Sequence, residues 1–567
     1  MTNNNSVWKL REGLKWDREF DYNYKDFLSY DLNLFWQDIK RIQENLIVSK
    51  VESTYFKSYN FYHDFILRFR FIKNFVFINF ENSKKETLTY SELYRYVEHL
   101  ASIWERKKVN SGKRIAIILP IGKELVIALG VALKLGLISS FLPPMPKSLL
   151  EKKLKVLSPD FVCTNYLSLV TGTDWEEKTI SVELENLKSS DDFQISDLSQ
   201  SKGYSYKPNE EIFEVLLGDE IWKVKANEAY LMPLSCALSF LELSSNIFFV
   251  FCGDGYNTIV PSIFLSCMSV GSCFVFVKNN ELLNFVEEIK KTQNKFVYMI
   301  EPKVRDIFLT QGIEFPQNCY VWLKDPFEDN DLYAWDLFIR KSNLDKTYCG
   351  NIHWDSRICG CILISPKIKR TAHFYVLPPF GVEWKFFDPV GIGEKSKADI
   401  GFLSIKPSGS EKEVITDKVV AKNNGIWVAS EISFSETIND YISDQDLCKF
   451  VLNFLKKEKK YNGFIDLVLL RVVTISGKKR VLLIFLPEGG FSEDLKKEIL
   501  DKIERTLGTE FLPEEVEFFL LFPHYEDSEK IDKSWCLNEY LFGRLKTREK
   551  NELFRLLTKL KVFLFKG

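Results

Sequence analysis

Residues 350–366 read GNIHWDSRICGCILISP, and they combine side chains that could do chemistry with an apolar run that could position them. Trp354, Asp355 and Arg357 offer an aromatic surface, a carboxylate and a guanidinium close together. The segment holds no glutamate, which a metal-assisted phosphate reaction would use. The run from Gly360 to Pro366 is typical of a buried β-strand that ends in a turn, so the polar residues form a loop before it.

Cysteines in the same region raise the possibility of a zinc site. Cys349, Cys359 and Cys361 lie near His353, but a zinc site needs four ligands in paired spacing. The 11 cysteines of the chain follow no regular framework, which favours buried thiols in a reducing compartment over disulfides. We therefore predict no metal site.

Length and composition limit the class of protein. A chain of 567 residues is too long for one hydrophobic core, so two or three domains are expected. Its content of 46% hydrophobic and 27% charged residues is ordinary for a soluble globular protein. The net charge of −2 provides no field for nucleic acid or an acidic membrane. The start is polar and no apolar stretch reaches the ~20 residues of a membrane span, so a cytoplasmic location is expected.

The elements that would position a site are clearest between residues 75 and 144. FVFINF at 75–80 alternates as a strand, and Thr89 with Glu92 forms a capping box at the start of a helix. RIAIILP at 114–120 is the near-continuous apolar run of a parallel strand buried on both faces. This alternation predicts an α/β layer fold.

A second strand and helix series predicts that the layers continue. The next helix spans Lys123–Leu135, and further alternation recurs from Phe248 to Ile307. The polar region 165–211 is predicted to be a long loop or an insertion. Strands at 465–473 and 480–487, followed by an amphipathic helix, predict a small α+β domain.

The order of these segments resembles the adenylate-forming acyl-CoA synthetases, in particular the acetyl-CoA synthetase branch. The segments are TLTYSELYRYVEHLASIW, KRIAIILPIGKELVIALGVALKLGLISSFLPP, GCILISP, PPFGVEWKFFDPVG and SEDLKKEILDKIERTLG. The resemblance implies a large domain of stacked α/β layers at 1–435, of the AMP-binding type, and a small mobile α+β domain at 436–567. It also implies a two-step reaction in which a carboxylate attacks the α-phosphate of ATP and a thiol then displaces AMP.

The phosphate loop of such enzymes is rich in Gly, Ser and Thr, and its counterpart here is EVLLGDEIWKVKANEA. Lys223 and Lys225 keep the positive charge, so the resemblance makes them candidates for phosphate binding. Most of the glycines and hydroxyls that would let the backbone approach a phosphate are gone. An ordinary surface strand remains the alternative for both lysines.

The opening segment aligns with a Gln-Thr-Glu-Thr-Gly motif of the family. Trp354 then keeps an aromatic wall, and Ile358 falls where the family has its magnesium-binding Glu. An isoleucine cannot hold Mg²⁺, which needs oxygen ligands. Asp355 is the nearby carboxylate that could compensate.

The ribose and catalytic positions also depart from the family. GIWVASE places Ser430 at the position of the ribose-binding Asp and Glu431 one residue later. The hinge motif becomes FSETIND, and the turn with the catalytic lysine becomes KSWC. Cys536 falls at the lysine position, and Lys533 is the nearby cation.

Together these departures predict an acetyl-CoA synthetase-like protein that is catalytically degenerate and acts as a binding or scaffolding subunit in acyl-CoA metabolism. The alternative is an active AMP-forming acid–thiol ligase that uses relocated residues, and only that alternative implies ATP, Mg²⁺ and CoA as cofactors. By analogy with the family, a partner would be an active homologue or another acyl-CoA enzyme, in a homo- or hetero-oligomer. No nucleic acid or membrane partner is expected.

Overall fold

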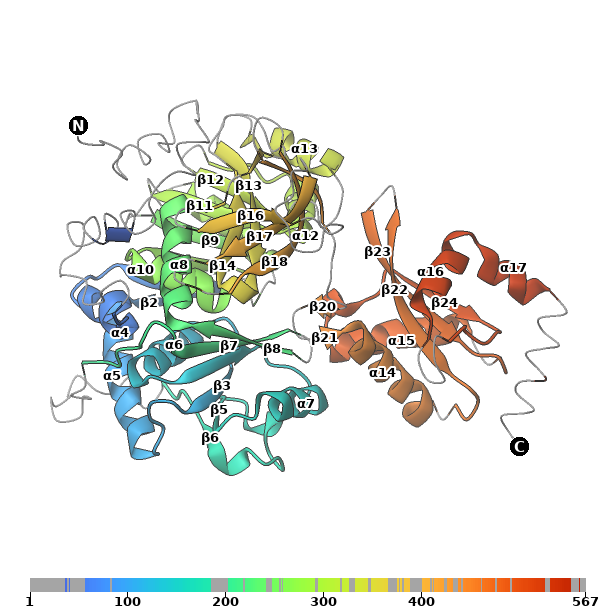
Figure 1. The fold of residues 1–567 in the computed structure, drawn as a ribbon, viewed down its shortest axis with the longest axis horizontal. Helices are drawn as coiled ribbons and strands as arrows, with labels where there is room; N and C mark the ends of the chain where they lie inside the picture. The colour runs from blue at the N-terminus through green and yellow to red at the C-terminus, as the bar shows by residue number, and fades with distance from the viewer. Residues whose placement is uncertain are drawn as a thin grey trace. The chain divides into compact units, whose positions relative to one another are not determined.

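The computed structural model describes most of the chain between residues 57 and 551 (Figure 1). Residues 36, 37, 40 and 560 are also described. The undescribed residues within the main range are 82–83, 185–201, 218–219, 241–246, 254–255, 257–258, 291–293, 317–318, 326–331, 345–347, 366–374, 377, 380–381, 388–399, 408–409, 411, 423–425, 432–436, 440–441, 460, 475–476, 490–491 and 526–530. The Gly-x-Gly segment GIGEK at 391–395 lies outside the described residues.

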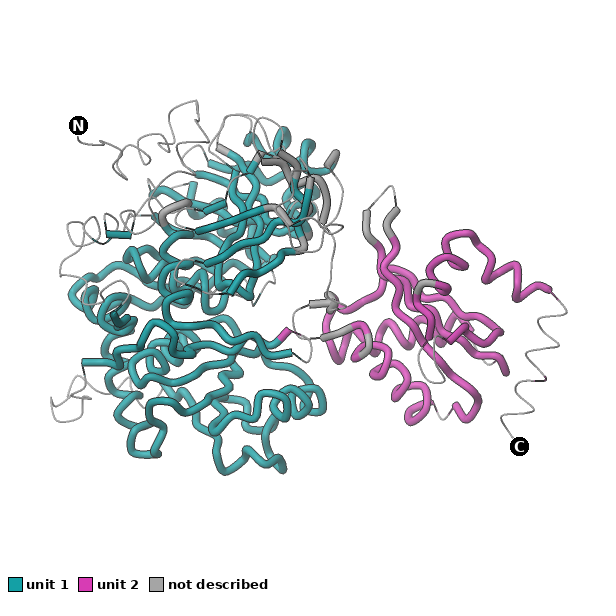
Figure 2. Tube along the Cα trace, in the orientation of Figure 1, with its two compact units in different colours: residues 1–216, 220–327, 331–433 teal, residues 217–219, 328–330, 434–567 magenta. Residues whose placement is uncertain are grey.

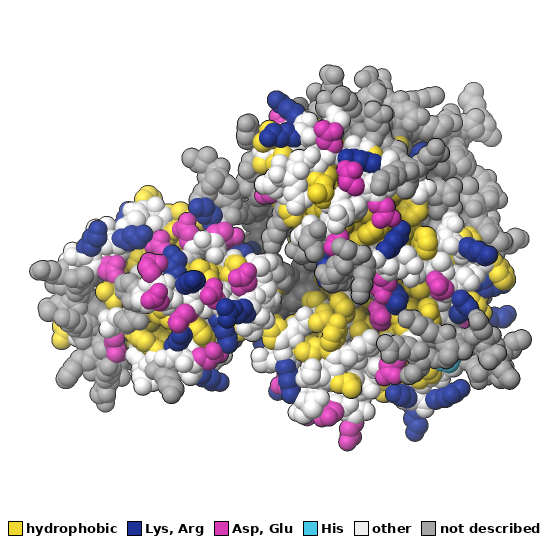
Figure 3. Space-filling model, turned by 180° about the vertical axis from the view of Figure 1, so that it is seen from behind, with side chains coloured by type: hydrophobic (Ala, Val, Ile, Leu, Met, Phe, Trp, Pro, Cys, Tyr) yellow, Lys and Arg dark blue, Asp and Glu magenta, His cyan; other side chains and the backbone are white. Residues whose placement is uncertain are grey.

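The chain divides into two compact units (Figure 2). Unit 1 comprises residues 1–216, 220–327 and 331–433, and unit 2 comprises 217–219, 328–330 and 434–567. On the face drawn in Figure 3, acidic and basic side chains are interspersed, as the small net charge leads one to expect.

The first sheet of unit 1 is six-stranded and carries the strand–helix–strand segment that the sequence predicts. Its spatial order is β6 (Thr179–Ile180), β5 (Phe161–Cys163), β3 (Arg114–Ile118), β4 (Ile138–Leu142), β7 (Glu211–Leu217) and β8 (Glu220–Lys225). β3 pairs in parallel with both β4 and β5 and is buried over Ile115–Ile118. The prediction of a parallel strand covered on both faces is confirmed.

Helices α5 (Tyr90–Arg106) and α6 (Lys123–Leu135) pack side by side in unit 1 (Figure 1). The capping box is confirmed: the Thr89 hydroxyl accepts from the Glu92 N–H, and the Glu92 carboxylate accepts from the Thr89 N–H. α6 ends at Gly136, whose φ of 73° suits a residue without Cβ.

The second sheet of unit 1 is eight-stranded and mostly parallel. Its spatial order is β14 (Gly360–Ile364), β13 (Tyr348–Asp355), β12 (Cys319–Lys324), β11 (Lys295–Ile300), β9 (Ile247–Cys252), β10 (Cys273–Val277), β1 (Phe75–Glu81) and β2 (Lys84–Thr89). The remaining helices of unit 1 are α4 (Phe61–Phe65), α7 (Lys147–Leu157), α8 (Ala226–Phe240), α10 (Phe264–Ser269), α11 (Leu282–Ile289), α12 (Pro302–Gln311) and α13 (Leu332–Lys341). α8 lies against β14.

A third, five-stranded sheet completes unit 1. Its order is β15 (Tyr375–Val376), β19 (Ile426–Glu431), β18 (Val414–Lys422), β17 (Ile400–Lys406) and β16 (Glu383–Phe387), with antiparallel pairing throughout. Buried side chains of this sheet share an apolar cluster with β14, to which Ile358, Leu403 and Val420 belong. This packing fixes β18 beside the β13–β14 hairpin.

Unit 2 is a small α+β unit with its own core. β22 (Asp466–Thr474), β23 (Gly477–Phe485) and β24 (Glu515–Phe519) form its main sheet, beside the short pair β20 (Thr437–Asn439) and β21 (Ile442–Ser443). Its helices are α14 (Asp444–Asn453), α15 (Glu493–Thr506), α16 (Lys533–Leu541) and α17 (Arg544–Lys550). The predicted α/β class, with stacked layers and a smaller α+β part, is confirmed.

Two local predictions are wrong. The polar residues 350–355 do not form a loop: they belong to β13, which pairs with β14 as a hairpin through the 3-10 turn η9 (Ser356–Ile358). The region 165–211 is not one long loop either, because β6 lies inside it and pairs with β5. In both places tertiary pairing outweighs the polar composition that suggested a loop.

None of the helices in the described part of the chain is both long and apolar enough to cross a membrane.

Candidate functional site

The strand order of the eight-stranded sheet changes direction at β9. The chain leaves β9 toward β10 on one side, while β11 lies on the other side and leads on to β12. In open α/β sheets, ligands bind outside the carboxyl ends of the strands at such a switch point. The candidate site is therefore the region at the carboxyl ends of β9 and β11, beyond Cys252 and Ile300.

Glu301 covers this switch point. Its N–H donates to the Cys252 carbonyl over 3.2 Å, so it follows β11 directly. A Cβ placed on Gly253 would lie 2.1 Å from Glu301 Oε2, so only glycine leaves room for the carboxylate there. The Glu301 side chain therefore occupies the space immediately above the ends of both strands.

An ion chain continues from Glu301 along the edge of the sheet; we use this term for Glu301, Lys324, Asp325, Lys418 and His353. Lys324 Nζ lies 3.7 Å from Glu301 Oε1 and 3.0 Å from Asp325 Oδ2. Asp325 Oδ1 lies 3.3 Å from Lys418 Nζ and 3.2 Å from His353 Nδ1. Two carboxylates thus face two ammonium groups, and the charges of these four members balance.

Asp325 is the centre of the ion chain. It directly follows β12 and turns the chain with a φ of 43°, a conformation that Asp tolerates better than most residues. Burial alone would raise its pKa, but Lys418, Lys324 and the hydrogen bond from His353 hold that pKa well below its usual range. Since a carboxylate only accepts, His353 Nδ1 carries the proton in this contact.

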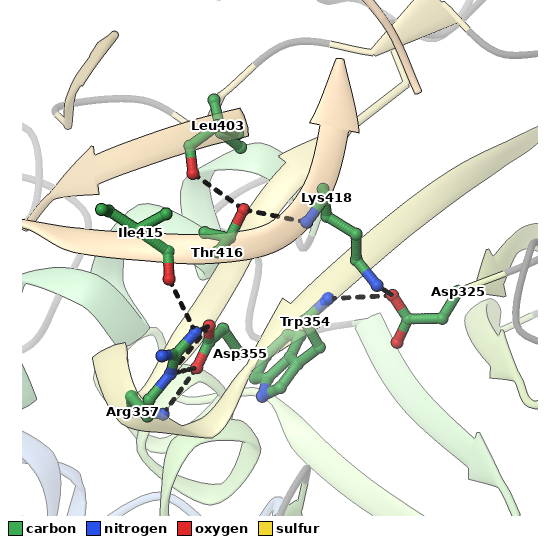
Figure 4. Close-up of polar contacts among 8 residues, drawn as sticks. All are labelled: Asp325, Trp354, Asp355, Arg357, Leu403, Ile415, Thr416 and Lys418. Atoms are coloured by element: carbon green, nitrogen blue, oxygen red, sulfur yellow. Dashed lines mark hydrogen bonds and ion pairs between the residues drawn. The ribbon is translucent and has the colours of Figure 1, made fainter. Parts of the chain in front are cut away.

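Trp354 joins the ion chain through its backbone (Figure 4). Its N–H donates to Asp325 Oδ1 over 3.4 Å, and its ring is buried. The indole Nε1 has no hydrogen-bond partner among the residues that the structure describes. Trp354 therefore lies beside ion pairs that the sequence did not reveal, and its role as an aromatic wall stays a prediction.

Asp355 is paired with its neighbour Arg357. The guanidinium Nε lies 3.0 and 3.2 Å from the two Asp355 oxygens, and Nη2 lies 2.6 Å from Oδ2 (Figure 4). Arg357 Nη2 also donates to the Ile415 carbonyl over 3.2 Å, which ties η9 to β18. Both oxygens that could have served a cation are thus engaged by a fork-shaped partner.

Ile358 faces an apolar environment. It is 1% exposed and packs in a cluster with Met232, Val376 and Leu403. The described residues of this cluster carry no side-chain oxygen, and Asp355 is committed to Arg357. The residues of the hairpin therefore do not fit a magnesium ion.

The two candidate phosphate lysines lie on β8, in the six-stranded sheet. Lys223 is exposed, and its Nζ lies 2.9 Å from Glu211 Oε1 on β7. Lys225 is half-buried at the end of β8, and its N–H donates to Glu228 in the first turn of α8. β8 packs against η9, so the structure brings this strand close to Ile358.

The remaining predicted residues lie on β19 and in unit 2. Ser430 and Glu431 pair with Val419 and Lys418 of β18, and their side chains are not among those described. Lys533 begins α16, where its Nζ lies 3.9 Å from Asp444 Oδ2. Strand pairing thus brings Glu431 beside Lys418 of the ion chain, while Lys533 belongs to the other unit.

Cys536 lies on the same helix and is fully buried in the core cluster of unit 2. Asp532, just before α16, caps the helix by accepting from the Trp535 N–H over 2.8 Å. The predicted KSWC turn is therefore the first turn of a helix, and the Cys536 side chain lies in the apolar core of unit 2.

The thiol and imidazole groups near the hairpin do not assemble as a metal centre. His353 is hydrogen-bonded to Asp325, and the Cys361 sulfur faces Cys236 of α8. Throughout the described residues, no three His, Cys, Asp or Glu side chains are grouped to hold a metal ion.

Sequence reasoning missed four members of the ion chain besides His353. Glu301 and Asp325 directly follow the parallel strands β11 and β12, and Lys324 is the last residue of β12. Polar residues at the carboxyl ends of strands were the signal that could have revealed them. Lys418 lies in the middle of β18 and gave no such signal.

The protein was compared with known families and structures. No protein-family model and no curated protein matches the sequence. Among solved structures, an o-succinylbenzoate CoA synthetase from Bacillus subtilis, bound to a product analogue, has a TM-score of 0.62 and 13% identity, and covers 84% of this chain and 97% of its own.

Two further structures are similar to the same degree. An artificially fused adenylation–PCP di-domain NRPS from Klebsiella oxytoca has a TM-score of 0.62 and 13% identity over 81% of this chain and 85% of its own. A fatty acid AMP ligase from Legionella pneumophila has the same score and identity over 86% of this chain and 96% of its own. The chain therefore has the fold of the adenylate-forming enzymes.

Proposed function

We propose that this protein is a catalytically degenerate relative of the AMP-forming acid–CoA ligases, of the acetyl-CoA synthetase type, that acts as a binding or scaffolding subunit in acyl-CoA metabolism. The observation that carries the proposal is the ion chain at the switch point. Glu301, Lys324, Asp325 and Lys418 satisfy one another's charge at the position where this class of sheet receives its ligand.

Adenylation depends on groups placed to stabilise the charge that develops on the phosphates. Loss of one such contact typically reduces the rate by about 10²–10³. Here Lys223 already faces Glu211, and Asp355 already binds Arg357. A nucleotide would have to compete with these internal partners. Ile358, at the position aligned with the magnesium-binding Glu of the family, has no oxygen to bind Mg²⁺.

A ligand titration tests the proposal. The full chain is titrated with ATP–Mg²⁺, AMP and CoA while thermal unfolding is followed, with an active adenylate-forming ligase as positive control. A ligand at 100 times its Kd, binding only the folded state, would add about 2.7 kcal/mol of stability. We expect no shift with ATP–Mg²⁺ and no acid-dependent release of pyrophosphate.

The second candidate is an active AMP-forming acid–thiol ligase that uses Lys223, Lys225, Asp355, Glu431 and Lys533 in new roles. The fold supports it, because the similar structures include ligases of this type. Stabilisation by ATP–Mg²⁺ together with pyrophosphate release that requires a carboxylic acid would establish this candidate and refute degeneracy. Stabilisation by CoA alone would instead identify a thioester-binding subunit.

The partner and location are part of the same proposal. We infer a cytoplasmic protein that associates with an active homologue or with another acyl-CoA enzyme. Purification of the native protein followed by identification of the co-eluting chains tests this directly. Recovery of the chain alone, at its monomer mass, would contradict a scaffolding role.

A further inference from the structure

Two buried cysteines meet between α8 and β14. Cys236 Sγ and Cys361 Sγ lie 3.5 Å apart, although the residues are 125 positions apart in the sequence. Both side chains are fully buried. An S–S bond is about 2.05 Å long, so the sulfurs need to approach by about 1.5 Å, which small side-chain rotations can supply.

The backbone of β14 brings the two thiols together. The Cys361 N–H donates to Cys236 Sγ over 3.1 Å. A Cβ on Gly360 would lie 3.0 Å from the same sulfur, so the absence of a side chain at Gly360 lets the strand approach α8 this closely. Two separate features of β14 therefore place the Cys236 sulfur against Cys361.

The two thiols differ in their surroundings. Cys236 Sγ accepts the hydrogen bond from the Cys361 N–H. Burial raises the pKa of Cys361, and the neighbouring Cys236 raises it further.

We propose that Cys236 and Cys361 are an oxidation site, at which a peroxide converts the two thiols into an intramolecular disulfide between α8 and β14. The inference is independent of the proposed function, because it rests on the sulfur geometry alone. A third buried thiol, Cys359, directly precedes Gly360, and its backbone is in the left-handed conformation. Cys359 is the competing partner that the test must exclude.

The chemistry balances with hydrogen peroxide as oxidant. One of the two sulfurs attacks a peroxide oxygen, the O–O bond breaks, water is released, and that cysteine becomes a sulfenic acid. The sulfur of the other cysteine then attacks the sulfenic acid sulfur, the S–S bond forms, and the S–O bond breaks with loss of a second water. The two thiols lose two electrons and two protons, and one peroxide becomes two waters.

The experiment uses the full-length protein treated with hydrogen peroxide while folded, then unfolded in denaturant and alkylated, because buried thiols do not react with the reagent in the folded state. We expect two fewer alkylated thiols among the 11 cysteines, reversal by dithiothreitol, and a cross-linked peptide that tandem mass spectrometry assigns to Cys236 and Cys361. Cys236→Ala and Cys361→Ala should each abolish the cross-link. Cys163→Ala is the matched control, since Cys163 is equally buried on β5 of the other sheet, and it should leave the cross-link intact.

Three results would overturn the proposal. The first is alkylation of all 11 thiols, after unfolding, in protein that was treated with peroxide while folded. The second is a cross-link that joins Cys236 to Cys359, which Cys359→Ala would remove and Cys361→Ala would not. The third is a cross-link that forms only after the far-ultraviolet circular dichroism signal is lost. The wild-type measurement decides the outcome even if an alanine variant fails to fold.

Discussion

The Asp325 carboxylate pairs with the side chains of Lys324, His353 and Lys418, and its own side chain is only 3% exposed. Replacement by Asn keeps the shape but removes the charge that Lys418, itself 2% exposed, faces. Breaking a buried ion pair by removing one partner typically costs 3–5 kcal/mol, because the other charge stays buried and uncompensated. We therefore expect Asp325→Asn to lower the free energy of unfolding by about 3 kcal/mol or more, as measured by urea denaturation.

The matched control is Asp336→Asn, which removes a carboxylate from an exposed pair with Arg340 on α13. Exposed pairs contribute only about 0.2–1 kcal/mol, so this variant should stay close to wild type. Adding Lys418→Met to Asp325→Asn should recover part of the loss, since the uncompensated ammonium is gone. Additive losses in the double variant would mean that the two groups are not coupled.

The charge of Asp325 also makes stability depend on pH. Its pKa in the folded protein is well below that of the unfolded chain, near 3.9, so the unfolded state binds the proton more readily. The contribution is complete above about pH 4 and is lost as the pH falls toward the folded pKa. The difference in unfolding free energy between wild type and Asp325→Asn should thus be constant from pH 5 to 7 and shrink below pH 4. A gap that widens on acidification would contradict this assignment.

Ile358 tests whether the lost acidic position could be restored. Its side chain lies in the apolar cluster with Met232 and Leu403, so Ile358→Glu would place a carboxyl group where no polar partner is described. Burying an unpaired polar or charged group costs several kcal/mol, whereas Ile358→Val should cost about 0.5–1.5 kcal/mol. We expect Ile358→Glu to lose more than about 3 kcal/mol and to show no stabilisation by Mg²⁺ or ATP–Mg²⁺. A folded Ile358→Glu protein that Mg²⁺ stabilises would place this side chain in a metal site.

At the scale of elements, the β13–β14 hairpin holds these residues in place. Asp355 and Arg357 fix its turn, and Arg357 reaches the Ile415 carbonyl on β18. β18 in turn carries Lys418 into the ion chain. The hairpin and β18 therefore act as one packed assembly, and the ion chain depends on strand positions that only tertiary pairing sets.

Local signals explain which elements the sequence could predict. The capping box at Thr89 and the helix stop at Gly136 depend on neighbouring residues alone, and both predictions are confirmed. The ion chain joins Asp325 to Lys418 across 93 positions, and no local pattern encodes such a contact. The Asp355–Arg357 pair spans two positions, so it could have been foreseen from the sequence.

The contact between α5 and α6 gives a prediction at this scale. A Cβ at Gly130 would lie 2.6 Å from Val97 Cγ2 and 3.0 Å from Ile66 Cδ1. Alanine is favoured over glycine in a helix by about 1 kcal/mol, but overpacking a core costs about 1–3 kcal/mol. We expect the overpacking to win and Gly130→Ala to be destabilised by about 1 kcal/mol in urea denaturation.

Truncating the neighbour separates the two effects. In Gly130→Ala combined with Val97→Ala, the space that the new methyl group needs is open, so the double variant should lose at least about 0.5 kcal/mol less than the sum of the single losses. If Gly130→Ala is more stable than wild type, helix propensity outweighs the clash and the packing argument fails.

At the scale of the whole molecule, each unit has its own core. Leu323 of β12 belongs to the apolar cluster of the eight-stranded sheet, and Leu483 of β23 belongs to the cluster of unit 2. Units with separate cores can unfold separately, so calorimetry of the full chain should resolve two transitions. Leu323→Ala and Leu483→Ala form a matched pair, because both side chains are fully buried leucines on strands.

The size of each shift follows from the size of each unit. Unit 1 holds about three times as many residues as unit 2, which gives unfolding entropies of about 0.9 and 0.3 kcal/mol/K. A loss of about 3 kcal/mol, typical of Leu→Ala in a core, should lower one midpoint by about 10 °C in Leu483→Ala and the other by about 3 °C in Leu323→Ala. Each variant should leave the other transition in place. If both variants lower one shared transition, the two cores unfold as a single cooperative body, and stabilisation by a ligand bound to unit 1 would then extend to unit 2.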